Sequence, residues 1–266
     1  MNTTKLTVSI FTALLFVSAA RASDIRVIAP YAGIITNEYA SSEYQLDMKD
    51  TGSMRGLFAQ WVAPDNFQVN AFYYYSPDVN YCRVSGLHLN ADWYPLRTAH
   101  GKYALGAGLE TLTVDLAAVG KISGVDSLLM DNNILFHYLR AGRYFYMKGG
   151  AFDFSLMPYA GYAFEKVTGD LVLDLPGPFP PVIRTDIGSR DEYPMGGLNA
   201  KAVFRHFLEV QAKWMGRFTG KGTLNEYSGL VNLYFNKHWG VSYRYKYMEY
   251  GTSSNMYHLA GLIYSF

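Results

Sequence analysis

The 266-residue sequence contains a single cysteine, Cys82, so an internal disulfide is excluded. Net charge is also nearly absent, because 23 lysines and arginines are balanced by 22 aspartates and glutamates. Such a balance lacks the basic patch that nucleic-acid-binding proteins carry. The six histidines are scattered without metal-ligand spacing. We therefore expect no nucleic-acid partner, no metal and no cofactor.

Long apolar runs are missing beyond the N-terminal region, so no transmembrane helix is expected there. Residues 6–20 are apolar or small, and Ala20-Arg21-Ala22 has the small-x-small pattern of a cleavage site. This segment is short for a spanning helix, and no cysteine follows it to carry a lipid anchor. We expect residues 1–22 to be a signal peptide and residues 23–266 to form the mature domain.

Tyrosine and alternating sequence patterns are abundant instead. The chain holds 23 tyrosines, and 50% of its residues are hydrophobic. Within residues 207–218, Val210, Ala212 and Trp214 alternate with Gln211 and Lys213. A period of two with an aromatic and aliphatic face predicts β-strands. Strands that alternate in this way, with many tyrosines for the interfaces, are typical of proteins that cross a membrane as β-barrels.

Twelve segments of about ten or more residues have the length of a transmembrane strand. The predicted fold is therefore all-β, a closed antiparallel transmembrane β-barrel of twelve strands, with ten strands and long extracellular extensions as the alternative. A soluble β-sandwich is a third possibility, but it would expose large apolar patches. The predicted strands are 26–40, 53–63, 67–76, 81–95, 103–114, 132–146, 150–167, 193–204, 207–218, 225–235, 239–250 and 255–266.

The predicted connections are short at one end of the barrel and longer at the other, as in outer-membrane barrels. In the loop 115–131, Val125, Leu128 and Leu129 have helical spacing, which predicts a short helix. The loop 168–192 contains a Pro-Gly break, so it either folds into the lumen or forms an extended strand pair. Within 132–146, two arginines of opposite parity predict a β-bulge.

The end of the chain resembles the assembly signal of outer-membrane β-barrels, through Gly261, Tyr264 and Phe266 in an alternating strand. The stretch 93–96, Trp-Tyr-Pro-Leu before a polar turn, is similar to a periplasmic turn of OmpA-like, opacity-like and porin-like barrels. The resemblance implies a location in the cell outer membrane, contact with its lipids and lipopolysaccharide, and recognition by the barrel assembly machinery. It does not specify an oligomeric state.

Polar residues on the inward face of the predicted strands are the candidate site. Hairpin geometry pairs Lys201 with Glu209 or Gln211, and His88 with Glu110. Acidic residues fall on the fourth to seventh predicted strands and basic residues on the eighth to eleventh, which predicts two opposed walls and a transverse field, as in porin constrictions. The candidate lumen residues are His88, Glu110, Asp153, Lys201, Glu209, Gln211, Lys213, Arg217, Arg244 and Lys246.

We expect a narrow passive diffusion channel, with a non-conducting structural or surface-interaction barrel as the alternative. A lipid-modifying enzyme is less consistent with the sequence, because such barrels need a serine and a histidine within hydrogen-bond reach. The residues Tyr247-Met248-Glu249 stand where a His-x-Ser would be required, and His258 has no serine two positions away. His137 lies among aromatic residues and is expected to pack at the membrane interface. The protein is therefore not expected to be an enzyme.

Overall fold

The computed structural model of the chain is all-β and describes residues 25–41, 46–63, 66–77, 82–98, 101–122, 125–176, 182–205, 207–220, 222–250 and 253–266. The predicted signal peptide lies outside the described residues. The strands within them are β1 (Ile25–Ser41), β2 (Leu46–Ala63), β3 (Phe67–Ser76), β4 (Cys82–Trp93), β5 (Arg97–Thr98), β6 (Gly101–Ile122), β7 (Val125–Gly149), β8 (Phe152–Asp174), β9 (Val182–Phe204), β10 (Leu208–Thr219), β11 (Gly222–Tyr234), β12 (Trp239–Tyr250) and β13 (Ser253–Ser265).

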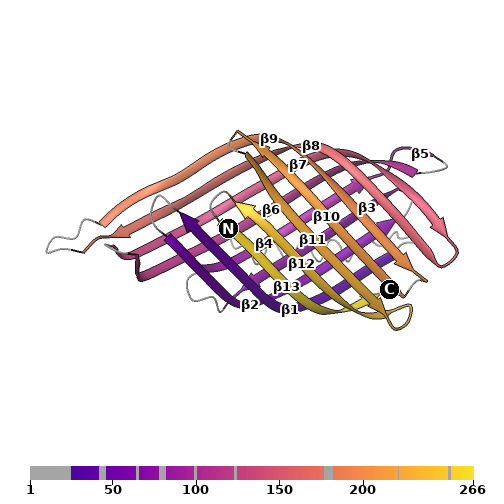
Figure 1. Cartoon of the computed structure of the whole chain (residues 1–266), viewed down its shortest axis with the longest axis horizontal. Helices are drawn as coiled ribbons and strands as arrows, with labels where there is room; N and C mark the ends of the chain where they lie inside the picture. Colours follow the sequence, from indigo (N-terminus) through magenta and orange to yellow (C-terminus); the bar gives the residue numbers. More distant parts are fainter. Residues whose placement is uncertain are drawn as a thin grey trace.

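The described strands form one closed antiparallel barrel of twelve long strands, with the two-residue β5 beside β6 (Figure 1). Strand β4 pairs directly with β6. The first strand pairs with the last, Val27 lying opposite Ser265, which closes the ring. Closure gives each long strand a partner on both sides, as spanning a membrane by strands requires. The twelve-strand prediction is confirmed, and the ten-strand alternative is wrong.

The two longest predicted loops are strand extensions. Strands β6 and β7 stay paired up to Ile122 opposite Val125, so the helix predicted in 115–131 is wrong. Their backbone groups bond to the partner strand, and every second side chain, such as Leu116 and Met130, turns inward. Strands β8 and β9 pair as far as Asp174 opposite Val182. This confirms the extended strand pair over a lumen-inserted loop, although residues 177–181 lie outside the described residues.

The bulge predicted in 132–146 is also wrong. The register of β7 against β8 is the same from Ser127 opposite Asp174 to Gly149 opposite Phe152, so no residue is inserted. The two arginines simply occupy opposite faces of a regular strand. Arg140 points into the lumen, and Arg143 lies outside, 5.2 Å from the ring centroid of Tyr103. A register shift does occur farther along, between Val119 and Ile122 on β6.

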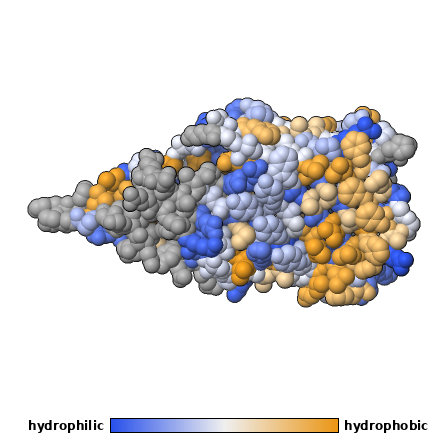
Figure 2. Space-filling model, viewed as in Figure 1, coloured by the Kyte–Doolittle hydropathy of each residue, from blue (hydrophilic) through white to orange (hydrophobic). Residues whose placement is uncertain are grey.

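The outer wall carries an apolar zone at one end of the barrel. Figure 2 shows apolar residues gathered over the end where Figure 1 marks the C-terminus, and polar residues over the middle of the barrel. The alternation predicted for β10 is confirmed, because Val210, Trp214 and Phe218 are exposed on the outside. The described part of the chain contains no helix long and apolar enough to span a membrane.

Glycines on the inner wall make room for inward tyrosines. Gly108 on β6 lies opposite Tyr138 on β7, and a Cβ at this glycine would stand 2.2 Å from the tyrosine ring. Gly86 and Tyr74 have the same relationship between β4 and β3, with a Cβ 2.4 Å from the ring. These rings lie against the wall and reach the lumen, where they contact polar side chains.

Candidate functional site in the barrel lumen

A group of buried charges crosses the lumen, and we call it the central belt: His88, Glu110, Lys213, Glu226 and Lys246. The Lys246 ammonium lies 3.5 Å from Glu110 and 3.3 Å from Glu226. Lys213 approaches the same Glu226 at 3.7 Å, and His88 approaches Glu110 at 3.7 Å. Lys213, Glu226, Lys246 and Glu110 therefore form one connected chain of opposite charges, and the His88 imidazole lies at its end.

The central belt joins opposite sides of the barrel. Lys246 is on β12 and Glu110 is on β6, and five long strands separate these two in either direction around the described ring. The side chains of both residues are only 7% exposed. Buried ions are tolerated when each charge has a partner and its hydrogen-bonding groups are satisfied. The contact between Lys246 and Glu110 joins strands on opposite sides of the ring, so this pair depends on closure of the barrel.

Two further ion pairs flank the belt. The Arg140 guanidinium donates hydrogen bonds to both carboxylate oxygens of Asp92 at 2.9 Å. Arg217 lies 3.3 Å from Glu165, which also accepts a hydrogen bond of 2.7 Å from the Tyr193 hydroxyl. These arginine–carboxylate contacts are charge-assisted and hold the surrounding strands in register across the interior.

The predicted separation into an acidic and a basic wall is wrong. Glu226 lies on β11, within the wall expected to be basic, and Arg140 lies on β7, within the wall expected to be acidic. Each of these residues neutralises neighbours of the opposite sign. In a low-dielectric interior, paired charges are far less costly than two separated sets. The lumen therefore holds interlocked ion pairs in place of a transverse field.

Above the belt, toward the ends of β6 and β7 away from the short turns, the interior is apolar. A cluster of buried side chains from six strands extends to this end, with Met130 and Ile134 of β7 packed against it. Leu112, Ile134 and Phe136 also lie beside the belt carboxylate Glu110 around a small void. An apolar constriction adds a second barrier to ions. The buried members nearest this end are Ile35, Met54, Cys82, Val84, Leu112 and Leu116.

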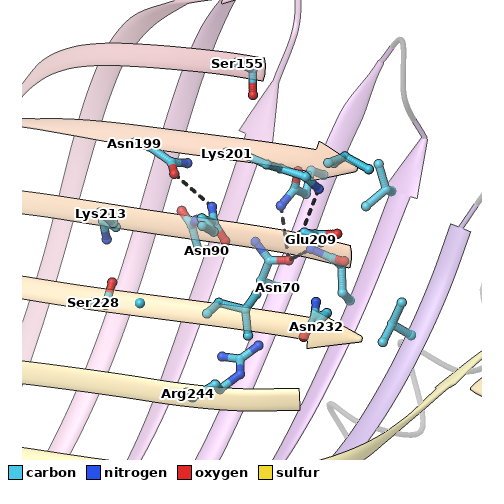
Figure 3. A pocket seen from close by; sticks show the side chains of 18 of the residues that line it. Asn70, Asn90, Ser155, Asn199, Lys201, Glu209, Lys213, Ser228, Asn232 and Arg244 are labelled. Atoms are coloured by element: carbon cyan, nitrogen blue, oxygen red, sulfur yellow. Dashed lines mark hydrogen bonds and ion pairs between the residues drawn. The ribbon is translucent and has the colours of Figure 1, made fainter. Parts of the chain in front are cut away.

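Below the belt is a cavity of about 520 Å³, which we call the cup. Its lining runs from Lys246 and Glu226 in the belt to the exposed Lys148 and Asp153 beside the short turn between β7 and β8. In outer-membrane barrels the short turns are periplasmic. Figure 3 shows side chains of β9 to β12 projecting into the cup, with Lys201 and Glu209 joined near its rim.

The structure gathers the candidate residues around these features. Two of them, Glu110 and Arg217, lie with Glu226 around the small void above the cup. The remaining candidates line the cup: His88, Asp153, Lys201, Glu209, Gln211, Lys213, Arg244 and Lys246.

The pairings predicted from hairpin geometry are confirmed. Lys201 lies 2.9 Å from Glu209 and in register with Gln211, and His88 is in register with Glu110. Two lumen residues were missed: Glu226 and Arg140 were not among the candidate site residues. A sufficient signal for Glu226 was present, because it shares the period-two parity of Ser228 on the same strand.

The two histidines considered for catalysis lie on the outer wall. His137 stacks on Phe164 with ring centroids 5.0 Å apart, and His258 Nδ1 lies 2.6 Å from the Tyr243 hydroxyl. Both neighbours are aromatic, which is consistent with interfacial packing. Among the described residues, no group of three or more His, Cys, Asp or Glu side chains could hold a metal ion.

Comparisons with known proteins identify the fold. No protein-family model and no curated protein matches the chain. Among solved structures, the translocator domain of the autotransporter NalP from Neisseria meningitidis is 13% identical, with a TM-score of 0.61 over 99% of this chain and 96% of that one. The transport unit of the autotransporter AIDA-I from Escherichia coli is 14% identical, with a TM-score of 0.51 over 99% of this chain and 97% of that one. The chain has the closed β-barrel fold of outer-membrane proteins.

Proposed function

We propose that this protein is an integral outer-membrane barrel whose lumen is closed to ions at mid-height, so that it is non-conducting at rest. The observation that carries the proposal is the position of Lys246, which contacts the Glu110 carboxylate across the lumen and the Glu226 carboxylate on the neighbouring strand β11. The sequence favoured an open passive channel. The side-chain arrangement supports the non-conducting alternative better.

The energetics support a persistent closure. A permeating ion would have to separate Lys246 from two buried carboxylates. Removing one partner from a buried ion pair typically costs about 3–5 kcal/mol. The ion would then meet the apolar cluster around Leu112 and Leu116, where its hydration shell would be lost. Thermal fluctuation alone would open such a lumen rarely.

The outer wall supports a location in the outer membrane. Exposed aromatic side chains, among them Trp93, Trp239 and Phe266, are typical of an interfacial girdle. On this proposal the apolar zone contacts lipid, and the extended hairpins of β6–β9 stand among lipopolysaccharide on the cell surface. The terminal strand, which ends at Phe266, would be the segment recognised by the barrel assembly machinery.

A gated narrow channel is the second candidate, and one observation favours it. Within the described residues, the belt consists of side chains on strands. Side chains can rearrange without moving the backbone of a closed barrel. A ligand or field that drew Lys246 away from Glu110 would link the cup to the space above it. The resting state would still be closed.

Ion flux into vesicles tests the proposal. Refolded protein in vesicles that contain a chloride-sensitive dye should admit chloride no faster than protein-free vesicles. A triple variant, Glu110→Ala, Glu226→Ala and Lys246→Ala, removes the belt while leaving the lumen wider. Faster flux in the variant alone supports a closed barrel with a side-chain barrier. Rapid flux in the wild-type protein contradicts the closure.

A further inference from the structure

Arg244 differs from four other cations that line the cup. The lining includes seven lysines and arginines and four carboxylates. Arg140, Lys201, Lys213 and Lys246 each contact a carboxylate. In the described part of the chain, Arg244 makes no salt bridge and no hydrogen bond, and its buried Nε atom is unsatisfied. In Figure 3 no dashed line reaches it.

Three aromatic rings hold the Arg244 side chain in place. Its guanidinium carbon lies 3.8 Å from the ring centroid of Phe58, 5.0 Å from that of Tyr31 and 5.3 Å from that of Phe72. These rings are at most 9% exposed, and they come from β1, β2 and β3. Cation–π contact fixes the plane of the guanidinium without using its N–H groups. The donors are therefore positioned for a partner that the described residues do not supply.

Amide side chains complete the lining of the cup. Seven asparagines and glutamines contribute to it, including Gln60, Asn70 and Asn232. Gln60 donates a hydrogen bond of 2.8 Å to Asn70, and Asn232 accepts one of 2.6 Å from Ser242. An amide both donates and accepts hydrogen bonds, as a sugar hydroxyl does. A cavity of about 520 Å³ is within the range of small-molecule sites.

From these observations we propose that the cup binds a carboxylated sugar, with its carboxylate on Arg244 and its hydroxyls on the surrounding amides. A planar guanidinium matches a carboxylate in a bidentate geometry. Arg244 offers a single guanidinium, and the deeper cations of the cup, Lys213 and Lys246, are paired with carboxylates, so a singly charged anion fits better than a phosphate dianion. The ligand would enter from the end with the short turns.

This site goes beyond the proposed closure of the lumen. The cup lies below the belt, so a ligand can bind in it whether or not ions pass the belt. The proposed closure and the proposed binding site can therefore be disproved independently. Ion flux tests the belt, and equilibrium binding to the closed protein tests the cup.

Calorimetric titration of the refolded protein in detergent micelles tests the site. The probes are glucuronate, galacturonate and gluconate, with glucose as the neutral counterpart and glucose 6-phosphate as the dianion. We expect at least one of the three sugar acids to bind at least about tenfold more tightly than glucose and glucose 6-phosphate. No binding by any of the three, or equal binding of glucose, overturns the proposal. Tighter binding of glucose 6-phosphate overturns the preference for a carboxylate.

Variants identify Arg244 as the anchor. Arg244→Met should weaken binding of the sugar acid at least about tenfold. Lys49→Met removes one positive charge from an exposed ion pair with Glu38, outside the cup, and is the control, with a change below about threefold. An equal loss of affinity in both variants would indicate a general electrostatic effect and would overturn the assignment of Arg244 as the anchor. Arg244→Lys keeps the positive charge but lacks the planar guanidinium, so it should weaken binding of the sugar acid several-fold. Unchanged affinity in this variant also overturns the assignment of Arg244 as the anchor.

Discussion

The Lys246 ammonium lies 3.5 Å from the Glu110 carboxylate although their strands stand on opposite sides of the barrel. The two residues are 136 positions apart in the chain, and five long strands separate β12 from β6 in either direction around the ring. The closed ring therefore brings the pair together across the interior. On our proposal, this same contact closes the lumen to ions.

Replacing Lys246 by methionine should destabilise the barrel by about 3–5 kcal/mol, because Glu110 and Glu226 would lose their shared cation while buried. Chemical unfolding of the refolded protein in vesicles measures this. Lys49→Met is the control, since Lys49 pairs with Glu38 on an exposed surface. Its effect should not exceed about 1 kcal/mol. Similar losses in the two variants would show that the belt does not contribute to stability.

The outer wall and the lumen should respond differently to a new arginine. Ala212 is exposed on the outside of β10, and Gln211 lines the cup. Ala212→Arg should cost about 2–4 kcal/mol if the residue lies near the bilayer midplane, and Gln211→Arg should cost much less. Unfolding in vesicles compares the two, and equal costs would contradict the assigned faces.

A methyl group at Gly108 should be harmful, because its Cβ would stand 2.2 Å from the Tyr138 ring. Gly108→Ala should destabilise the barrel by about 1–3 kcal/mol through overpacking. Gly188→Ala on β9 is the matched control, since a Cβ there meets nothing within 4 Å. If the two alanine variants unfold at the same denaturant concentration, the close packing of Tyr138 against Gly108 does not contribute to the stability of the barrel.

Four aspartates stand directly opposite one another on the exposed surface of the extended hairpins: Asp115, Asp131, Asp170 and Asp186. Partial burial and the Asp131 carboxylate raise the pKa of Asp115, against the lowering effect of Arg83. Because the pKa is higher in the folded state, ionisation of Asp115 reduces stability as the pH rises through the interval between its unfolded and folded pKa values.

Replacing Asp131 by asparagine removes the central charge of this row. We expect a gain of up to about 1 kcal/mol at neutral pH, as for other like charges placed directly opposite each other. The gain should vanish in acid, where the carboxylates are protonated, and should shrink in high salt. Asp174→Asn is the control, because Asp174 faces Ser127 and Val182. A gain that persists in acid would exclude charge repulsion as its cause.

The local alternation of apolar and polar residues was sufficient to predict much of the fold. Alternation in residues 207–218 predicted the two faces of β10, because side-chain direction in a strand depends only on parity. The β8–β9 extension was left open between an extended strand pair and a loop in the lumen, because its outward residues, such as Asp170 and Asp186, are polar and resemble loop residues. Their inward partners, Leu171 and Leu173, carry the strand signal. Twist and hydrogen bonding to a partner strand override local propensity there.

The site was harder to predict than the fold. Contacts such as Lys246 with Glu110 or Arg140 with Asp92 join strands that are not neighbours, so no hairpin arithmetic relates them. They depend on the order of strands around the ring and on the width of the lumen. The sequence therefore predicted which residues face inward, such as Lys213 and Arg217, but not that acids and bases would interlock.

Single-channel recording in a planar bilayer tests the closed lumen most directly. Purified, refolded protein is inserted at low density and held at a series of voltages of both signs. We predict a membrane current indistinguishable from that of the bare bilayer, with discrete openings appearing only when Glu110, Glu226 and Lys246 are all replaced by alanine. A steady, voltage-independent conductance in the wild-type protein would contradict closure by the central belt.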